Sequence, residues 1–436
     1  MFTILIPLIV SSKLIVTSFN KTVWVKSLDT IELRCEVKLK ATDLEDGQFF
    51  TSWSYSPSLK IHRLIDGDDV IEWDSRRITF DIGQLFDGDT VTLKFSYMTA
   101  PLPKNIHSTY VFLPFKKIRW AKHQKITVLL DDDLNFINWP LNTSPSNNTL
   151  EIDENALKSR AMVVVSLRRK SWLYRYRVKV TLKSFSNSLF LMSAMLPAPD
   201  LRQSVDSTEI EIVPDGKVIL NRGRLTARWS NISDSAIIET DVFLRTSIGF
   251  ADSIPPTRKD IASGKFVKWN SSLRKYVLQV VGDAKDPYQR ARILTDYVHN
   301  YLTYTENREK ASSFAILKRG YGNCEDYAIL LTAMLRSIGI PARIANGAAE
   351  GQQSNLFDSH AWVEAYLDGH WMSFDPAWGL TSGYIPLSHI KFFHTRDSRT
   401  PSLRVRSTKR TRTYQEWSIR PFDLDENKQR DGENHS

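Results

Sequence analysis

The chain has 436 residues, a length that at about 150 residues per domain predicts two to four domains. Apolar residues make up 42% and charged residues 25%, which excludes a wholly disordered or collagen-like chain. Lysine and arginine outnumber the acids by 58 to 49, and this surplus permits contact with anionic surfaces without requiring nucleic acid. The two cysteines, Cys35 and Cys324, are too few for a disulfide scaffold or a multi-thiolate zinc site.

The start of the chain carries a candidate targeting segment. Residues 2–10 are nearly all apolar, and the run is too short to span a bilayer. It is similar to the apolar region of a secretory signal, and Val16 with Ser18 fits a small-residue cleavage rule. No lysine or arginine precedes the run, so a buried first strand is the alternative. We expect residues 1–18 to be a signal peptide and the protein to be exported or at the cell surface, and cytoplasmic otherwise.

Strand patterns follow as far as about residue 170. Residues 31–39 alternate between apolar and polar side chains, which predicts that Cys35 is a core thiol. The polar segment 138–155 indicates a loop. An immunoglobulin-like β-sandwich is therefore predicted over residues 19–170. Its other predicted strands lie at 77–82, 90–97, 125–130 and 162–167, with turn signals at Asp66-Gly67 and Asp87-Gly88.

Three further segments complete the predicted domain organisation. A second β domain is expected over residues 171–258, and an extended linker over 259–272. Helical periodicity then begins, and Asp286-Pro287 is typical of a helix cap followed by proline at the first helical position. Residues 396–436 are predicted to be a basic and then polar tail that is partly disordered, with the basic part a solvated face rather than a site for an anionic polymer.

Cys324 lies at the predicted start of a helix. Asn323 can cap this helix, and Gly339 followed by Pro341 can end it. The unpaired amides and the dipole at a helix start favour the thiolate form of a cysteine, which is the nucleophilic form. Cys324 is therefore a candidate nucleophile, although a single cysteine at a helix start is more often structural.

A hairpin downstream offers a base for this thiol. Residues 359–367 and 370–375 predict two strands joined by a two-residue turn at Asp368-Gly369. If Leu367 pairs with His370, then His360 and Asp375 become diagonal neighbours on one face, and His370 falls on the other. A carboxylate that orients an imidazole is what Cys-His-Asp catalysis requires. A solvated histidine and a strand-ending Asp-Pro are the structural alternatives, but the three residues together favour a catalytic site.

Four motifs carry a family resemblance: Gly322-Asn-Cys324-Glu-Asp-Tyr-Ala, Gly339-Ile-Pro-Ala-Arg343, His360-Ala-Trp-Val-Glu364 and Asp375-Pro376. Together they resemble the transglutaminase-like superfamily of bacteria and archaea. The resemblance implies an α+β papain-like core over residues 273–395. It also implies that Cys324 is the nucleophile, His360 the general base and acid, and Asp375 the orienting carboxylate.

The resemblance extends weakly to two other places. Tyr304 lies where the family often has an aromatic residue after its first core helix. Residues 196–229 look like the β domain that often precedes this core, including Pro197-Ala-Pro-Asp200 and Gln203-Ser-Val205.

The activity implied is attack by Cys324 on an amide carbon of a protein or peptide substrate, through a thioacyl intermediate. The chain shows no acidic spacing typical of a calcium loop and no cysteine pairs like those of the N-glycanase zinc site, so no metal or other cofactor is expected. Hydrolysis by a protease or amidase is favoured over transglutaminase-type transfer to a lysine amine. A non-catalytic scaffold that binds through its β domains is the alternative from another class, and no specific nucleic acid partner is expected.

Overall fold

The structure is a computed structural model of the chain. It describes residues 14–27, 30–42, 52–55, 61, 63–67, 70–99, 110–115, 121–157, 161–167, 171–184, 188–232, 234–306, 309–351, 356–397 and 403–421. The chain divides into two compact units, residues 1–104 with 108–168, and residues 169–436 with 105–107. None of the helices in the described part of the chain is long and apolar enough to cross a membrane.

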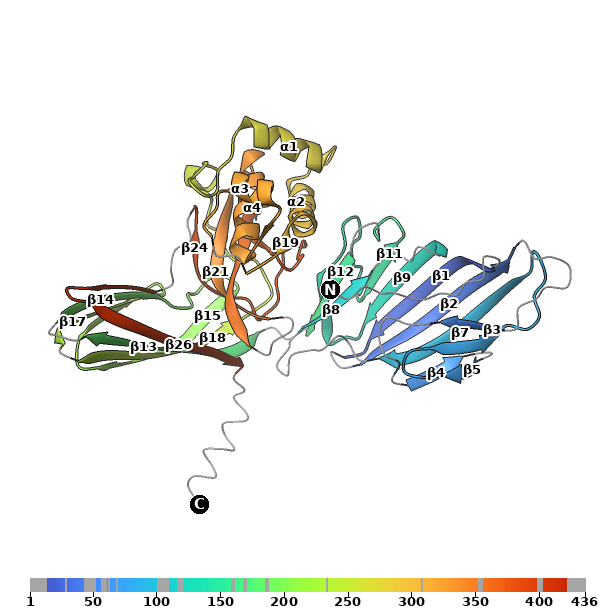
Figure 1. Cartoon of the computed structure of the whole chain (residues 1–436), viewed down its shortest axis with the longest axis horizontal. Coiled ribbons are helices and arrows are strands. Elements are labelled where there is room, and N and C mark those ends of the chain that lie inside the picture. Colours follow the sequence, from blue (N-terminus) through green and yellow to red (C-terminus); the bar gives the residue numbers. More distant parts are fainter. Residues whose placement is uncertain are drawn as a thin grey trace, which may run out of the picture. The chain divides into compact units, whose positions relative to one another are not determined.

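The first unit is built from strands. In the described residues they form a six-stranded sheet in the order β11-β9-β1-β2-β7-β4 and two three-stranded sheets, β10-β12-β8 and β3-β6-β5 (Figure 1). Their alternating side chains enclose one apolar core, in which Cys35 is buried as predicted. The strands are β1 (Leu14–Val25), β2 (Ile31–Ala41), β3 (Ser52–Tyr55), β4 (Arg63–Gly67), β5 (Val70–Trp73), β6 (Ile78–Asp81), β7 (Thr90–Thr99), β8 (Tyr110–Phe115), β9 (Ala121–Leu130), β10 (Leu134–Asn138), β11 (Thr149–Asp153) and β12 (Ala161–Leu167).

The structure corrects two predictions for this unit, the start of the domain and one loop. The domain starts at Leu14 or earlier rather than at residue 19, because β1 begins there and lies between β2 and β9. Val16 and Phe19 of β1 are buried, so a cleavage after Ser18 would remove part of a central strand. The signal peptide stays a prediction, and residues 1–13 lie outside the described residues. The segment 138–155, predicted as a loop, contains β11 at the edge of the large sheet.

The second unit contains a β-sandwich. One sheet has the order β15-β18-β13-β26 and the other β16-β17-β14-β25 (Figure 1). A shared apolar core lies between them. The strands are β13 (Trp172–Ser184), β14 (Ser188–Met195), β15 (Gln203–Val213), β16 (Lys217–Asn221), β17 (Arg224–Ile232), β18 (Ser235–Thr246), β25 (Leu403–Ser407) and β26 (Thr411–Pro421).

The predicted tail is wrong for residues 403–421, which supply one strand to each sheet. β25 pairs with β14, and β26 pairs with β13 along its whole length. In β25 Leu403 and Val405 point to the core and alternate with the exposed Arg404 and Arg406. In β26 Trp417 and Ile419 point to the core, but most of the other positions are polar and exposed, so its sequence does not show a clear strand pattern. The second β domain is therefore discontinuous, and residues 422–436 of the predicted tail lie outside the described residues.

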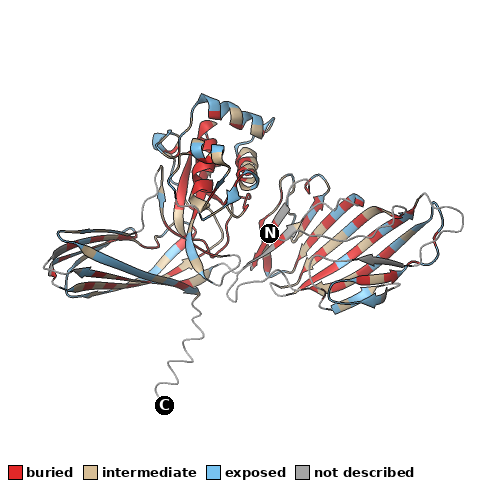
Figure 2. Cartoon of the chain, in the orientation of Figure 1, coloured by how far each residue is buried: buried red, intermediate tan, exposed pale blue. Residues whose placement is uncertain are grey.

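An α+β domain lies between the two parts of this sandwich in the sequence, and its elements run from Ser271 to Thr395. Its four-stranded sheet has the order β23-β22-β21-β24. Helix α4 packs on β21 and β22 and is buried over nearly its whole length (Figure 2). The elements are α1 (Ser271–Val281), α2 (Pro287–Tyr301), β19 (Thr303–Tyr304), α3 (Ser313–Arg319), β20 (Tyr321–Gly322), α4 (Cys324–Ser337), β21 (Ala342–Glu350), β22 (Phe357–Leu367), β23 (His370–Phe374) and β24 (Ile390–Thr395).

The predicted helix signals and the predicted linker have different outcomes. Asp286 caps α2 with Pro287 at its first turn, as the sequence indicates. Residues 259–272 do not form a free linker, because Val267 is fully buried in the core of the α+β domain. Asp260 is also buried, in an ion pair with Arg396 at 2.7 Å. The linker prediction was wrong because the few buried residues of this segment are separated by polar ones, so that no apolar pattern is visible in the sequence.

The role of β26 can be tested with two substitutions on that strand. Ile419 is 8% exposed and Tyr414 is 48% exposed. We expect Ile419→Ala to lower the free energy of unfolding by about 2 kcal/mol, because it removes buried apolar volume. Tyr414→Ala should change stability little. Thermal denaturation checks both, and equal effects of the two substitutions would contradict the pairing of β26 with the sandwich core.

Candidate functional site

Cys324 is the first residue of α4 and is partly buried. The Asn323 side chain accepts a hydrogen bond from the amide of Asp326, whose carboxylate accepts one from the Asn323 amide. Arg319 pairs with the same buried carboxylate at 2.6 Å. A Cβ on Gly322 would lie 2.5 Å from the Cβ of Asp326, so glycine is required there by the Asp326 side chain. The cap thus fixes the start of the helix, and with it the sulfur.

His360 lies on β22, in the hairpin register that the sequence predicts. Leu367 pairs with His370, and the ladder continues to the pair of Val363 with Phe374. The pairing ends there, so the strand does not extend to Asp375, which forms an isolated bridge with Leu380 instead. Asp375 therefore reaches His360 from the start of a turn rather than from a paired strand.

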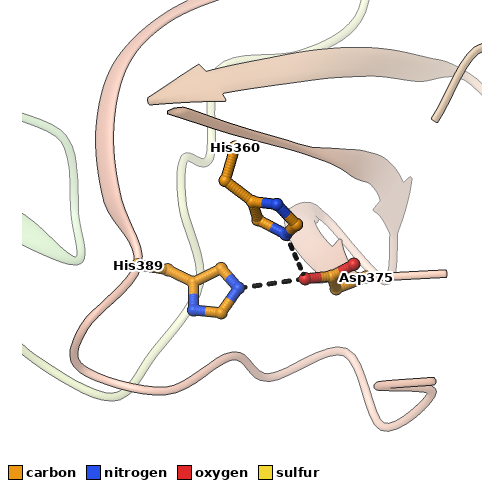
Figure 3. Close-up of side chains that lie close together, drawn as sticks. All are labelled: His360, Asp375 and His389. Atoms are coloured by element: carbon orange, nitrogen blue, oxygen red, sulfur yellow. Dashed lines mark hydrogen bonds and ion pairs between the residues drawn. The ribbon is translucent and has the colours of Figure 1, made fainter. Parts of the chain in front are cut away.

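The Asp375 carboxylate is fully buried and accepts four hydrogen bonds, of which Figure 3 shows the two from His360 and His389. Its Oδ1 accepts from the backbone amides of Ala377 at 3.0 Å and Trp378 at 3.2 Å. Its Oδ2 lies 2.7 Å from Nε2 of His360 and 3.0 Å from Nε2 of His389. Burial alone would raise the pKa of Asp375, but the charge of His360 and the hydrogen bonds from both imidazoles hold it well below its usual range.

His360 interacts with both of the other predicted site residues. Burial opposes its charged form, but the Asp375 carboxylate and a hydrogen bond with the Cys324 side chain raise the pKa of His360 to about 10. Because Nε2 of His360 faces Asp375, Nδ1 is the nitrogen that remains for the sulfur. The structure therefore brings Cys324, His360 and Asp375 together. His370, excluded by the register, stacks on the ring of Phe250 instead.

His389 is a member of this cluster that the sequence did not reveal. It is fully buried, and burial together with the charges of His360 and Arg202 outweighs the effect of Asp375 and lowers its pKa to about 4. His389 is thus neutral at neutral pH and donates its Nε2–H to Asp375. It lies in a segment without strand or helix periodicity, so no local pattern pointed to it.

Aromatic rings surround the two imidazoles. The ring of Trp378 lies 5.2 Å from that of His360 and 4.7 Å from that of His389, measured between centroids. Trp362 is fully buried and lies 5.3 Å from His389. These rings limit access of water to the Asp375 carboxylate, which strengthens its interaction with His360.

Tyr304 lies beside the start of α4. It forms a parallel pair with Gly322, two residues before Cys324, and its side chain is 51% exposed. Burial and the nearby Cys324 both raise the pKa of Tyr304. The aromatic position noted in the sequence is therefore next to the candidate nucleophile.

The β-sandwich holds the segment that carries His389. Arg202 donates to the backbone carbonyls of His389 at 3.1 Å and Pro386 at 3.0 Å. Nearby, Lys391 lies 2.7 Å from Asp200 of the sandwich and 2.8 Å from Glu364 on β22. Burial alone would raise the pKa of Glu364, but Lys391 and Arg343 lower it to about 2. Residues of the predicted β-domain motif thus anchor the candidate site.

The same cluster contains residue types that bind metals. Donor atoms of His360, Asp375 and His389 lie within 4.8 Å of one another. Both imidazole Nε2 atoms, however, are at hydrogen-bond distance from one carboxylate oxygen, and His360 also interacts with Cys324. Both imidazoles thus act as hydrogen-bond donors to the same carboxylate, an arrangement that is suited to proton transfer.

Comparison with known families supports the resemblance seen in the sequence. Residues 274–376 match the model of the transglutaminase-like superfamily, a range that includes Cys324, His360 and Asp375 and ends before His389. The kyphoscoliosis peptidase of Mus musculus is 28% identical over 144 residues, which are 30% of this chain and 21% of that protein. The protein YebA of Bacillus subtilis is 24% identical over 131 residues, 25% of this chain and 18% of that protein. The chain thus spans about a fifth of these relatives.

The chain was also compared with solved structures. A Cytophaga hutchinsonii protein, provisionally described as a cysteine protease, covers 59% of this chain with 92% of its own length. The TM-score is 0.46 and the sequence identity 16%.

The buried charges beside the site give a stability prediction. Lys391→Met should lower the free energy of unfolding at neutral pH by about 3 kcal/mol, because it removes the cation that Asp200 shares with the buried Glu364, which then keeps only Arg343 as an ion-pair partner. The cost should shrink as the pH falls from 4.5 towards 2, where Glu364 becomes protonated. Chemical denaturation across this range checks it, with the exposed Lys183→Met as control. An effect of Lys391→Met no larger than that of the control would contradict the assignment.

Proposed function

Since residues 274–376 of this chain form a domain of the transglutaminase-like superfamily, we propose that the protein is a cysteine-dependent enzyme that attacks amide bonds of protein or peptide substrates. The observation that carries the proposal is the Cys324–His360–Asp375 arrangement, in which His360 lies between a partly buried cysteine and a fully buried carboxylate. Such an order of groups activates a nucleophile in cysteine catalysis.

The proposed reaction starts with a thiolate at Cys324 paired with an imidazolium at His360. The sulfur attacks the amide carbon, and the oxygen that becomes negative accepts a hydrogen bond from the backbone amide of Cys324 at the start of α4. His360 then gives its Nδ1 proton to the departing nitrogen, so that ammonia or an amine leaves and a thioacyl enzyme remains. Asp375 stays ionised throughout and keeps Nε2–H of His360 in place.

The second half of the reaction decides between two activities. In hydrolysis, neutral His360 takes a proton from water, whose oxygen attacks the thioacyl carbon and releases a carboxylic acid. In transfer, a lysine amine attacks instead and an isopeptide bond forms. We propose hydrolysis as the main activity. Mass spectrometry of a glutamine-containing peptide incubated with and without a primary amine separates the two, because only transfer incorporates the amine in place of the released ammonia, whereas hydrolysis incorporates water.

A labelling experiment tests the reactivity of Cys324. At about pH 7, below the usual pKa of a thiol, iodoacetamide should alkylate Cys324 much faster than Cys35. The reason is that Cys324 pairs with a charged imidazole, whereas Cys35 is a core thiol that is 4% exposed. Peptide mapping by mass spectrometry measures both rates. Equal labelling in the folded protein would exclude an activated thiol.

Two substitutions test the proposed roles. Cys324→Ala should abolish amide turnover, and Asp375→Asn should lower kcat by orders of magnitude because the orienting charge is lost. Cys35→Ala is the matched control and should keep its turnover. Release of ammonia or amine measures the rate for all three variants. Near-normal turnover by Cys324→Ala would remove this site from consideration.

His389 is proposed as a positioning residue for Asp375. His389→Gln keeps an N–H donor near the position of Nε2 and should keep most of kcat. His389→Leu removes the donor, so kcat should fall with KM little changed. The pKa of Asp375 should then rise, so that its carboxylate becomes protonated at a higher pH. The acid limb of the pH profile of kcat should therefore shift to higher pH. Equal losses in the two variants, or a change confined to KM, would show that His389 only fills space.

A further inference from the structure

The β-sandwich has one outer face on which positive charges gather. On the sheet β16-β17-β14-β25, Lys217 lies opposite Arg228, Arg228 opposite Leu191, and Leu191 opposite Arg406. These four side chains form one row across all four strands. Because the inward neighbours of these residues form the apolar core, the row points outward.

Two neighbouring rows continue the same pattern. In the next row Arg404 lies opposite Ser193, and Ile219 at the other end lies opposite Thr226. One row further, Arg224 lies opposite both Asn221 and Met195. We define the basic face as the exposed residues Lys217, Arg224, Arg228, Arg404 and Arg406 together with Leu191 and Ile219.

The basic face contains no compensating acid. None of the residues of β14, β16, β17 and β25 is an aspartate or glutamate, and Asp215 precedes β16 outside the strands. Within the described residues, its five cations have no ion pair or side-chain hydrogen bond. Like charges directly opposite each other, as Lys217 and Arg228 are, destabilise a sheet.

The other sheet of the same sandwich provides the comparison. On its outer face Asp241 pairs with Arg175 at 2.8 Å and with Arg177 at 2.9 Å. Lys179 pairs with Glu239, and Arg245 with Asp206. On this outer face four cations are thus paired with acids, whereas no cation of the basic face has an acidic partner within the described residues.

We propose that the basic face binds the surface of an anionic lipid bilayer. Its cations suit anionic headgroups, and the exposed aliphatic side chains of Leu191 and Ile219, 37% and 65% exposed, suit insertion between them. A regular sheet has its backbone groups paired within it, so it can lie flat against such a surface. No aromatic side chain occupies an outward position of these strands, which disfavours a single-stranded nucleic acid, because its bases would have no stacking partner.

The test uses the full chain and sedimentation with vesicles. Phosphatidylcholine vesicles containing about one third phosphatidylglycerol should bind the protein, and pure phosphatidylcholine vesicles should not. Binding should weaken as salt is added. Each Lys or Arg near an anionic surface contributes about fivefold in affinity, so the double variant Arg228→Glu/Arg406→Glu should lose at least about 25-fold.

The matched control carries the same change of charge on the other sheet. Lys183→Glu/Arg420→Glu alters two exposed cations there and should keep most of the binding. A third variant, Ile219→Ser, tests the aliphatic contact at unchanged net charge and should weaken binding. The proposal would be overturned if the two double variants lost binding equally, or if the protein did not bind anionic vesicles. It would also be overturned if a single-stranded oligonucleotide bound more tightly than the vesicles and this binding were lost in Arg228→Glu/Arg406→Glu.

Discussion

The buried carboxylate of Asp375 is the constraint around which the candidate site is built. A charge that water cannot reach must be stabilised by donors from the protein, and Asp375 has four of them. Two come from the turn that follows β23, so the backbone there has little freedom. The other two are imidazoles, and the charge they stabilise in turn raises the pKa of His360. The protonation of His360 and the geometry of the turn are therefore two results of one interaction.

This constraint extends into the β-sandwich. His389 can donate to Asp375 only if its segment is held in place, and Arg202 of the sandwich holds that segment through two backbone carbonyls. Lys391 ties the same region to Asp200 and to Glu364 on β22. The sandwich is completed by β25 and β26, which follow the α+β domain in the chain. Residues far apart in the sequence thus support one carboxylate.

What could be predicted from the sequence was local. The cap at Asn323, the helix after Cys324 and the hairpin turn at Asp368-Gly369 depend on neighbouring residues, so their patterns are visible in the chain. His389 depends on a contact with Asp375 and on Arg202, which is 187 residues away, and no local pattern encodes either. β26 was missed for a related reason, because its partner β13 lies more than two hundred residues earlier and its outward charges are typical of a solvated tail.

The most direct test of this account is the pKa of His360, measured by NMR on protein with labelled histidine and assigned with His360→Gln. We expect a pKa of about 10 in the free protein, because Asp375 and Cys324 stabilise the imidazolium. In Asp375→Asn it should fall towards the ordinary value of about 6.5. A pKa near that ordinary value in the unmodified protein, or no change in Asp375→Asn, would contradict the claim that the buried carboxylate controls the site.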